Sequence, residues 1–468
     1  MKRASFVIAI LALVVSSCGL KVPVTIVAGE RIEDGFVDDA GPTDGVGVDD
    51  GLGGVEEGPD AGLPTIDPTA TGGPIDGGGG LFENETEGVT NQQITICGHV
   101  PITGAAPIPH DEDRFGQFYF NYVNAELGGI YGRKVRFLAY NDEYNPAGAR
   151  RAVEKCKRAG AFFYVGAAGT DQIVSVAKWA ERNRLPYFHG PTSDKDLGNT
   201  VYDVHVGPTY EYQHELLAQY LIGRFGKDVK YGVVKVNSPY FDAGADSFVK
   251  EITKLGGEVV VNTAVQKDES NFQSVFFELQ DKNVRVINNF TTPTIWTKML
   301  TQKPAGYSPT WTAVSPVAGF NIVAAALKNS KAIVFHHFNP ACECTTYKDE
   351  EISQHKNLPW YSDIQEFLRI FKKYSPEQDP PADDFDYASY LGAKALHRIL
   401  LTAGEKPTRT KLWTLLKTYK EDAKVVSPGC AGDFTRTEAR KGAWRVNIFE
   451  LVSSRGVWKQ IGDCVDQV

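Results

Sequence analysis

Long apolar runs are scarce in this sequence of 468 residues. The run Phe6–Val15 has ten residues, and no other segment approaches the roughly 20 apolar residues of a membrane helix. Enzyme signatures are also absent: there is no G-x-S-x-G elbow, no H-E-x-x-H, no P-loop and no G-x-G-x-x-G after a strand. The histidines are scattered along the chain. The sequence therefore gives no support to an integral membrane protein or an enzyme.

Excess charge is confined to one region. Residues 19–90 hold 16 acidic and 2 basic side chains, whereas residues 91–468 carry a net charge of only +3. A nearly neutral folded part does not favour nucleic acid or a strongly acidic partner. Residues 19–90 are rich in Gly, Asp, Pro and Thr and cannot bury enough apolar surface to offset their ordering entropy. They are predicted to form a disordered spacer.

The N-terminus has the pattern of a bacterial lipoprotein signal. Met1-Lys2-Arg3 is a short basic region before the apolar run, which ends in Val15-Ser16-Ser17-Cys18. Small residues before a cysteine resemble a lipobox, in which the cysteine receives diacylglycerol and becomes the new N-terminus after cleavage. Residues 1–17 are thus predicted to be a signal peptide, and Cys18 a lipid anchor. An ordinary signal peptide with an incidental cysteine is the alternative.

Residues 91–468 alternate short apolar strands with amphipathic helices, which predicts an α/β fold with parallel sheets and right-handed crossovers. About 378 residues are too many for one ordinary domain and fit two lobes. The expected strands are 94–100, 134–140, 161–165, 185–189, 231–236, 258–262, 284–289, 310–314 and 332–338. The expected helices include 111–127, 146–159, 171–183, 210–225, 242–255, 271–281, 384–404 and 408–419.

The stretch Asn121–Pro146, NYVNAELGGIYGRKVRFLAYNDEYNP, carries the most specific pattern. A helix stops at Gly128-Gly129, a strand follows, and Asn145-Pro146 starts the next helix. This block resembles the type I periplasmic solute-binding proteins, in particular the leucine/isoleucine/valine-binding group. The likeness extends from about Gln93 to Ile461.

The resemblance implies two Rossmann-like lobes joined by three hinge crossings. Lobe 1 is expected to comprise residues 91–207 and 338–445, and lobe 2 residues 208–337 and the C-terminal strands 446–468. The segment 339–360 is expected to be irregular.

Seven cysteines are present. If Cys18 is acylated, six remain outside the cytoplasm, where disulfides persist, and they allow 15 pairings. One pairing has a geometric argument: in a sheet ordered 2-1-3, the helix after strand 2 crosses strand 1, so Cys156 and Cys97 can face each other. The remaining pairing is open among Cys342, Cys344, Cys430 and Cys464. The spacing Cys342-Glu-Cys344, with His336-His337 upstream, is an alternative pattern for a metal site, but zinc sites prefer wider cysteine spacing, and no metal is predicted.

The expected ligand site lies beyond the carboxyl ends of the strands, where helices begin. By the resemblance, hydroxyl and backbone donors there hold the ligand's carboxylate. Thr170 falls on the family's serine and Ser193 on its threonine. A plain helix N-cap is the alternative for each hydroxyl. Gly104, Gly169 and Thr192 complete the set expected from lobe 1.

Lobe 2 departs from the family's pattern. The amino-acid binders place an acidic residue where this chain has Ser315, and tyrosines where it has Phe241, beside Tyr240, and Phe290, beside Thr291. Trp311 is a further aromatic candidate. Because a buried ammonium without a counter-charge is costly, these departures favour an apolar or aromatic carboxylate over a standard amino acid.

The resemblance implies an extracytoplasmic, lipid-anchored, monomeric receptor. It would bind a small organic solute between two hinged lobes and deliver it to the permease subunits of an ABC importer, with no cofactor, nucleic acid or catalysis. A sensory receptor on the same fold, which reports the solute to a membrane partner, is the alternative.

Overall fold

The computed structural model divides the chain into two units, Met1–Asp76 and Gly77–Val468, and both of the large sheets lie in the second. The structure describes residues 81–107, 116–166, 169–190, 192–198, 200–205, 208–315, 323, 326–327, 330–336, 361–375, 384–418, 420–421, 432–433, 446–452 and 457–465. The predicted signal peptide, Cys18, Cys342, Cys344 and Cys430 lie outside these residues, as does the segment 339–360.

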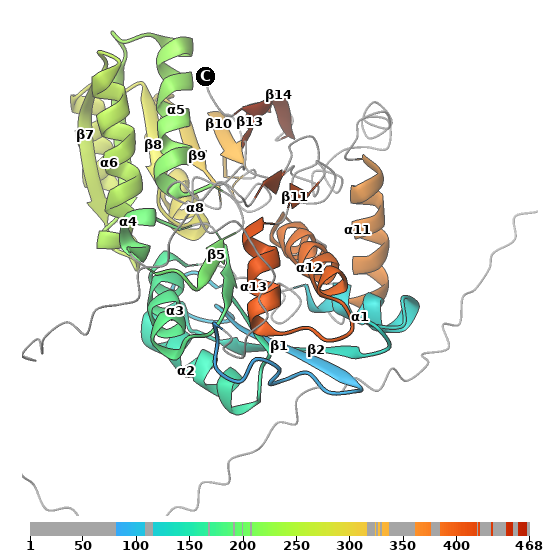
Figure 1. The fold of residues 1–468 in the computed structure, drawn as a ribbon. Helices are drawn as coiled ribbons and strands as arrows, with labels where there is room; N and C mark the ends of the chain where they lie inside the picture. Colours follow the sequence, from blue (N-terminus) through green and yellow to red (C-terminus); the bar gives the residue numbers. More distant parts are fainter. Residues whose placement is uncertain are drawn as a thin grey trace, which may run out of the picture. The chain divides into compact units, whose positions relative to one another are not determined.

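Lobe 1 is built on a parallel sheet of order β2-β1-β3-β4-β5. The strands are β1 (Gln93–Val100), β2 (Lys134–Asn141), β3 (Phe163–Gly166), β4 (Tyr187–His189) and β5 (Asp203–His205). One face is covered by α2 (Pro146–Arg158) and α3 (Thr170–Asn183), and the other by α1 (Gln117–Glu126), α11 (Tyr361–Tyr374), α12 (Asp384–Ala403) and α13 (Arg409–Thr418) (Figure 1). The predicted 2-1-3 order is confirmed.

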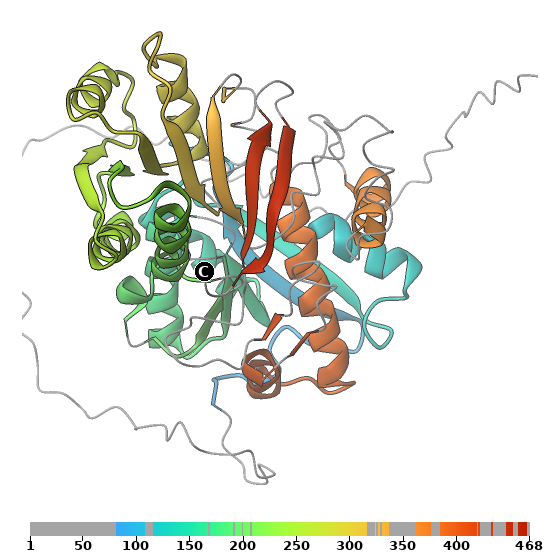
Figure 2. The ribbon, with the colours of Figure 1, turned by 90° about the horizontal axis from the view of Figure 1, so that it is seen from above.

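Lobe 2 contains the second sheet, of order β14-β13-β10-β9-β8-β6-β7. Its strands are β6 (Lys230–Val236), β7 (Glu258–Val265), β8 (Val286–Phe290), β9 (Thr310–Val314), β10 (Lys331–His336), β13 (Val446–Val452) and β14 (Val457–Val465). The first five are parallel, and the C-terminal hairpin β13–β14 joins β10 in antiparallel fashion (Figure 2). The lobe-2 helices are α5 (Tyr210–Phe225), α6 (Pro239–Lys254), α7 (Gln273–Asp281) and α8 (Pro293–Thr301). A short helix α4 (Asp194–Leu197) precedes them, and β11 (Lys420–Glu421) pairs with β12 (Gly432–Asp433).

The predicted helix–Gly-Gly–strand block forms as expected. Gly128 and Gly129 adopt φ of 74° and 79°, which a glycine tolerates without strain. The amide of Gly129 donates to the carbonyl of Val123 and closes α1. The Asn124 side chain donates to and accepts from the backbone of Val135, so α1 is fixed to β2. At the next helix start, Asn145 caps α2 by accepting from the amide of Gly148.

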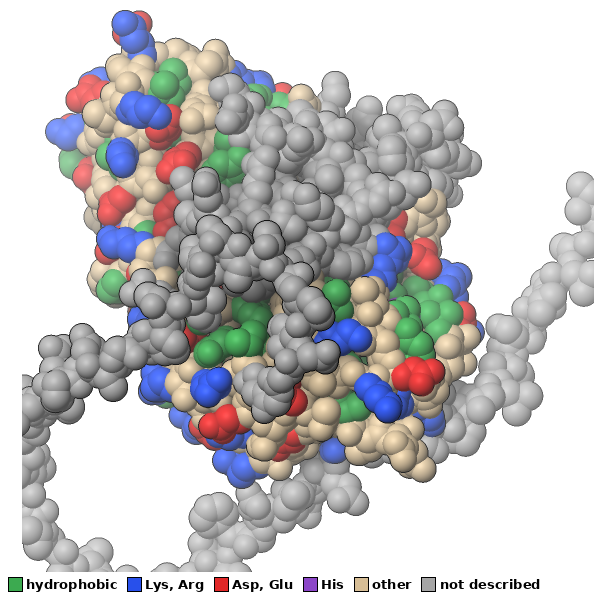
Figure 3. Space-filling view, viewed as in Figure 1, with side chains coloured by type: hydrophobic (Ala, Val, Ile, Leu, Met, Phe, Trp, Pro, Cys, Tyr) green, Lys and Arg blue, Asp and Glu red, His purple; other side chains and the backbone are tan. Residues whose placement is uncertain are grey.

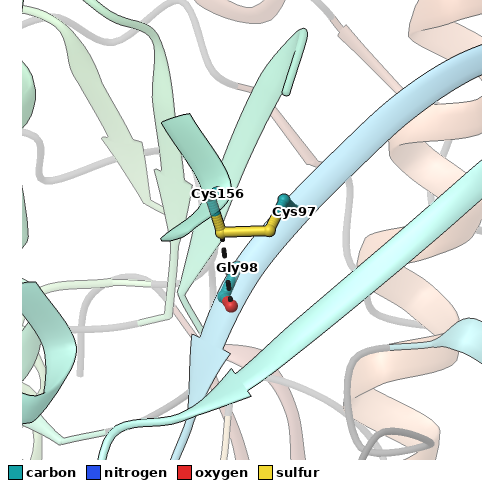
Figure 4. Close-up of a disulfide and its surroundings, with 3 residues drawn as sticks. All are labelled: Cys97, Gly98 and Cys156. Atoms are coloured by element: carbon teal, nitrogen blue, oxygen red, sulfur yellow. Dashed lines mark hydrogen bonds between the residues drawn. A yellow bond between two sulfur atoms is a disulfide. The ribbon is translucent and has the colours of Figure 1, made fainter. Parts of the chain in front are cut away.

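Cys97 on β1 and Cys156 on α2 form a disulfide whose sulfur atoms lie 2.11 Å apart (Figure 4). Both residues are fully buried. The Cys156 sulfur is also 3.7 Å from the Gly98 carbonyl oxygen, a contact without hydrogen bonding because a disulfide sulfur carries no proton. The bridge therefore holds the crossover helix on the central strand of lobe 1.

The structure corrects the end of the predicted disordered spacer. Residues 81–90, predicted to be disordered, pack on lobe 1. Phe82 is buried against Tyr202 and Trp413. The buried guanidinium of Arg409 donates to the carbonyls of Glu83, Ala161 and Phe162 and to the Glu87 carboxylate. Composition alone missed this stretch because its few anchoring side chains are surrounded by polar ones.

Several element bounds also differ from the predicted ones. Helix α6 begins at Pro239, directly after Ser238, and not at Asp242. β4 and its partner β5 each cover only three residues, and β5 was not among the expected strands. Helix α11 was also not anticipated. The lobe boundaries in the chain stay predictions.

Candidate functional site

The candidate site in lobe 1 lies between the end of β3 and the start of α3. Gly169 precedes the helix with φ of 95°, and no side chain caps the helix N-terminus. The hydroxyl of Thr170 and both amide atoms of Gln172 are buried and have no hydrogen-bond partner in the part of the chain that the structure describes. Buried polar groups are almost always bonded. The first turn of a helix also has N–H groups without an intrahelical partner. These N–H groups and the Thr170 and Gln172 side chains could donate hydrogen bonds to an acceptor group on a bound ligand.

The two predicted hydroxyl side chains after β4 differ in their hydrogen bonding. Thr192 is fully buried, and its Oγ1 has no partner within the described residues. Ser193 Oγ donates to Glu211 Oε1 over 2.6 Å. That bond ties the start of α4 to α5, so the Ser193 proton is already committed. Of the two, Thr192 is the donor that remains available.

A buried network of hydrogen bonds lies at this edge of the lobe-1 sheet. His99 Nδ1 lies 2.7 Å from Asp142 Oδ2, and His99 Nε2 lies 2.7 Å from the Tyr187 hydroxyl. Because a carboxylate only accepts, we assign the proton to Nδ1, and Nε2 then accepts from Tyr187. A Cβ on Gly166, the last residue of β3, would lie 2.0 Å from the Tyr187 hydroxyl oxygen, so this position requires glycine. The histidines are scattered along the sequence, so their positions did not reveal this network.

Gly104 lies on the loop after β1 and is exposed. Its φ is 109°, and a Cβ there would lie 2.1 Å from the Glu143 carbonyl oxygen. Asn141 holds the same loop by accepting from the amides of Ile102 and Thr103. Gly104 thus allows the β1 loop to pack closely on the β2–α2 turn.

The predicted aromatic residues of lobe 2 pack mainly against one another. The Phe290 ring centroid lies 4.9 Å from that of Phe241, 5.0 Å from Tyr210 and 4.4 Å from His214. Phe290 and Trp311 are fully buried and Phe241 nearly so, all in the lobe-2 core. Only Tyr240 is half-buried, and it packs on the lobe-1 cluster around α2 and α3. These rings therefore belong mainly to the buried core beneath the candidate site and not to the surface that a ligand would contact.

Burial also sets the protonation of two groups in this cluster. His214 Nδ1 lies 2.7 Å from the Tyr210 carbonyl, so the proton is on Nδ1. Burial lowers the pKa of His214 to about 4. Burial raises the pKa of Tyr210 to about 12, partly opposed by the nearby Thr170 hydroxyl. That contact falls short of hydrogen-bond geometry, so we count Thr170 Oγ1 as unbonded. Both side chains are neutral at pH 7.

Unbonded polar groups also mark the carboxyl edge of the lobe-2 sheet. Ser315, directly after β9, is fully buried, and its Oγ has no partner among the residues described. On β8, both amide atoms of Asn288 and the nitrogen of Asn289 are likewise unbonded within the described ranges. Thr291 donates to Asn289 Oδ1 over 3.1 Å. The sequence reasoning missed both asparagines, although two adjacent amides in the apolar strand VINNF were the available signal.

Among the residues that the structure describes, an ion pair connects the two lobes. Asp171, the second residue of α3, is bonded to Lys267, which follows β7. Asp171 Oδ1 also lies 3.4 Å from the Ser238 hydroxyl. The Lys267 ammonium lies 5.7 Å from the Tyr144 ring centre, and burial raises the pKa of Tyr144. A carboxylate is thus present beside Thr170, but a lysine already neutralises it.

Within the described ranges, no group of three or more His, Cys, Asp or Glu could hold a metal ion. Over the same residues, no helix is both long and apolar enough to cross a bilayer. His336 is buried on β10 and Cys464 lies on β14, whereas their proposed partners fall outside the described residues.

The chain matches the periplasmic binding protein family over residues 94–454. None of the curated proteins compared with it matches. A fatty acid ABC transporter substrate-binding protein from Thermomonospora curvata is similar in structure, with a TM-score of 0.68, 17% identity, and coverage of 82% of this chain and 95% of that one.

Two further solved structures are similar. The first is a branched-chain amino acid ABC transporter protein from Thermus thermophilus with bound valine, with a TM-score of 0.64, 17% identity, and coverage of 81% and 97%. The second is an ABC transporter solute-binding protein from R. palustris in complex with benzoate, with a TM-score of 0.62, 16% identity, and coverage of 80% and 97%. At identities this low, the structural similarity establishes the shared fold alone. With the family match, they place this chain in the periplasmic binding protein family, whose members are solute-binding proteins of type I fold.

Proposed function

We propose that this protein is a lipid-anchored, extracytoplasmic receptor that binds a small organic carboxylate between its two lobes and delivers it to an ABC importer. The observation that carries the proposal is the set of buried, unbonded polar side chains at the carboxyl edges of both sheets. Thr170, Gln172 and Thr192 belong to lobe 1, and Asn288 and Ser315 to lobe 2. Leaving such groups unbonded costs about 1–3 kcal/mol each, and a ligand that bonds to them would recover part of that cost.

The lobe-1 groups favour an anionic end on the ligand. Hydroxyl and amide donors surround the start of α3, where the helix dipole places partial positive charge. Asp171 lies in the first turn of this helix and is neutralised by Lys267, while nearby Glu211 accepts the Ser193 proton. A carboxylate placed at this helix start would meet donors on several sides.

The lobe-2 groups do not favour an ammonium on the ligand. Asn288 and Ser315 offer neutral donors and acceptors, and position 315 carries no charge to neutralise a cation. A buried ammonium would keep most of its desolvation cost. Since the aromatic rings are largely enclosed in the core, the proposed ligand class depends on these polar groups more than on the rings.

A thermal-shift panel tests this function. The panel pairs carboxylates (benzoate, octanoate, 4-methylpentanoate) with their amides and adds the branched-chain amino acids. Binding to the folded state raises the melting temperature by mass action, and we expect carboxylates to raise it and the matched amides to raise it less. Equal shifts from acid and amide, or no shift from any class, would refute the proposal.

Anchoring has a separate test. We expect Cys18→Ala to release the protein from membranes, because the acyl chains provide the attachment. Ser17→Ala keeps a small residue before the cysteine and serves as the matched control. Membrane association that survives Cys18→Ala would contradict the lipobox interpretation without touching the solute site.

A further inference from the structure

A basic groove runs along the outer side of α2 and α3. It encloses about 750 Å³ and is open to solvent. Five cations line it, namely Arg150, Arg151, Lys155, Arg158 and Arg182, and all are exposed. Figure 3 shows Lys and Arg side chains at the lower left of the coloured part of the molecule, in the region where Figure 1 labels α2 and α3.

The cations of the groove are mostly uncompensated. Glu154 is the one acid in the lining, and it accepts the Trp179 indole proton over 2.6 Å. Arg151 pairs with the exposed Glu143. Among the residues that the structure describes, Arg150, Arg158 and Arg182 have no ion-pair partner. This density of charge is unusual on a folded part that carries a net charge of only +3 over residues 91–468, so it marks a surface for an anion.

The composition of this face indicates which anionic partner fits. Protein interfaces concentrate their affinity in aromatic and apolar anchors. The exposed large hydrophobic side chains of the described residues lie elsewhere, and none is on α2 or α3. A lipid surface requires no such anchor, because each Lys or Arg near an anionic leaflet gains attraction independently. Long, unpaired arginines on two neighbouring helices suit that diffuse attraction.

We propose that the α2–α3 groove is a docking surface for an anionic phospholipid bilayer. It would hold lobe 1 against the membrane with α2 and α3 toward the phosphate headgroups. The attraction acts over about a Debye length, roughly 8 Å at physiological salt, so docking is reversible and weakens with ionic strength. The proposal depends neither on acylation of Cys18 nor on the identity of the solute.

Vesicle co-sedimentation tests the proposal on residues 18–468, the chain expected after removal of the signal peptide, carrying Cys18→Ala so that neither the apolar run nor an acyl chain contributes. The protein is mixed with phosphatidylcholine vesicles, with and without phosphatidylglycerol. Arg150→Gln, Arg158→Gln and Arg182→Gln are then combined. The control combines Lys227→Gln, Lys250→Gln and Lys298→Gln, three exposed cations of lobe 2, and removes the same charge. The acidic N-terminal region is present in every variant, so any repulsion between it and the anionic vesicles does not affect the comparison.

We expect binding to the phosphatidylglycerol vesicles alone, and its loss on raising salt. Each cation contributes about fivefold to partitioning, so the triple arginine variant should bind on the order of a hundredfold more weakly. The lysine control should change much less. Equal losses in the two variants would overturn the proposal, as would equal binding to neutral vesicles. Absence of binding to anionic vesicles, with arginine-dependent binding to an acidic protein, would assign the groove to a protein partner instead. Unchanged melting temperatures would show that both variants fold.

Discussion

The Asp171 carboxylate at the start of α3 in lobe 1 is bonded to the Lys267 ammonium of lobe 2. The two residues are 96 positions apart in sequence. Asp171 is 8% exposed and Lys267 30%, so the pair is partly shielded from solvent. Such a contact exists only while the two lobes are close, and it therefore biases any hinge equilibrium toward the closed state.

We expect Lys267→Gln to weaken solute binding about fivefold. The variant loses a contact worth up to about 1 kcal/mol and leaves the Asp171 charge beside the ligand's anionic end. Titration calorimetry measures the affinity, and X-ray scattering reports whether the unliganded protein expands. Lys298→Gln, an exposed lysine of the same lobe, is the control. Unchanged affinity in Lys267→Gln would show that the pair has no part in closure.

Arg409 is expected to be a major contributor to the stability of lobe 1. Its buried guanidinium bonds to three backbone carbonyls and to Glu87. Arg409→Met leaves these acceptors unpaired and should lower the free energy of unfolding by roughly 3 kcal/mol. Urea denaturation measures the change. Lys411→Met, an exposed cation two residues on, should cost little, and a similar loss in both variants would contradict this account.

The Cys97–Cys156 bridge should be found by non-reducing peptide mapping of the purified protein. The bridge closes a loop of 59 residues, and its removal should cost roughly 2–4 kcal/mol of unfolding free energy. The double variant Cys97→Ala, Cys156→Ala provides that measurement by denaturant titration. Recovery of both cysteines as free thiols would exclude the bridge and its role in holding α2 on β1.

The lowered pKa of His214 is expected to make the stability of the fold depend on pH. Its pKa is lowered by burial to about 4 in the folded state, against about 6.5 when unfolded. Between these values the unfolded chain binds more protons, so the stabilisation is complete above pH 6.5 and is lost as the pH falls toward 4. The slope should be about 1.4 kcal/mol per pH unit in that window.

The contribution of His214 can be isolated with His214→Leu, which should flatten the stability–pH curve between pH 6.5 and 4. His397, whose pKa burial also lowers to about 4, contributes the same sign and stays in both proteins. A slope that is identical in the parent and in His214→Leu would mean that His214 does not titrate as proposed.

Much of the fold was accessible from the sequence because its signals are local. Gly128-Gly129 and Asn145-Pro146 act through backbone conformation and capping, which depend on neighbours in the chain. In a sheet ordered 2-1-3, the crossover helix after strand 2 then covers strand 1, which places the two cysteines face to face. Residues 81–90 were misjudged because their stabilisation comes from Arg409, more than 300 positions away.

The site was only partly predictable for a similar reason. Thr170 and Thr192 follow from the rule that ligands bind beyond the strand ends. The pairing of Asp171 with Lys267, and the commitment of Ser193 to Glu211, depend on side chains that meet only in three dimensions. Phe241 and Phe290 fit the expected apolar character, yet their mutual packing encloses them in the core.

We propose that lobe 1 binds a carboxylate through donors that include Thr170, and that lobe 2 does not accommodate an ammonium. Titration calorimetry of the purified protein with 4-methylpentanoate and with leucine compares two ligands that differ in the amino group. We expect the acid to bind more tightly, and Thr170→Val to weaken its binding by roughly 1–3 kcal/mol. Thr402→Val, an exposed helical threonine of lobe 1, should have no effect. Tighter binding of leucine, with affinity unaffected by Thr170→Val, would contradict the account.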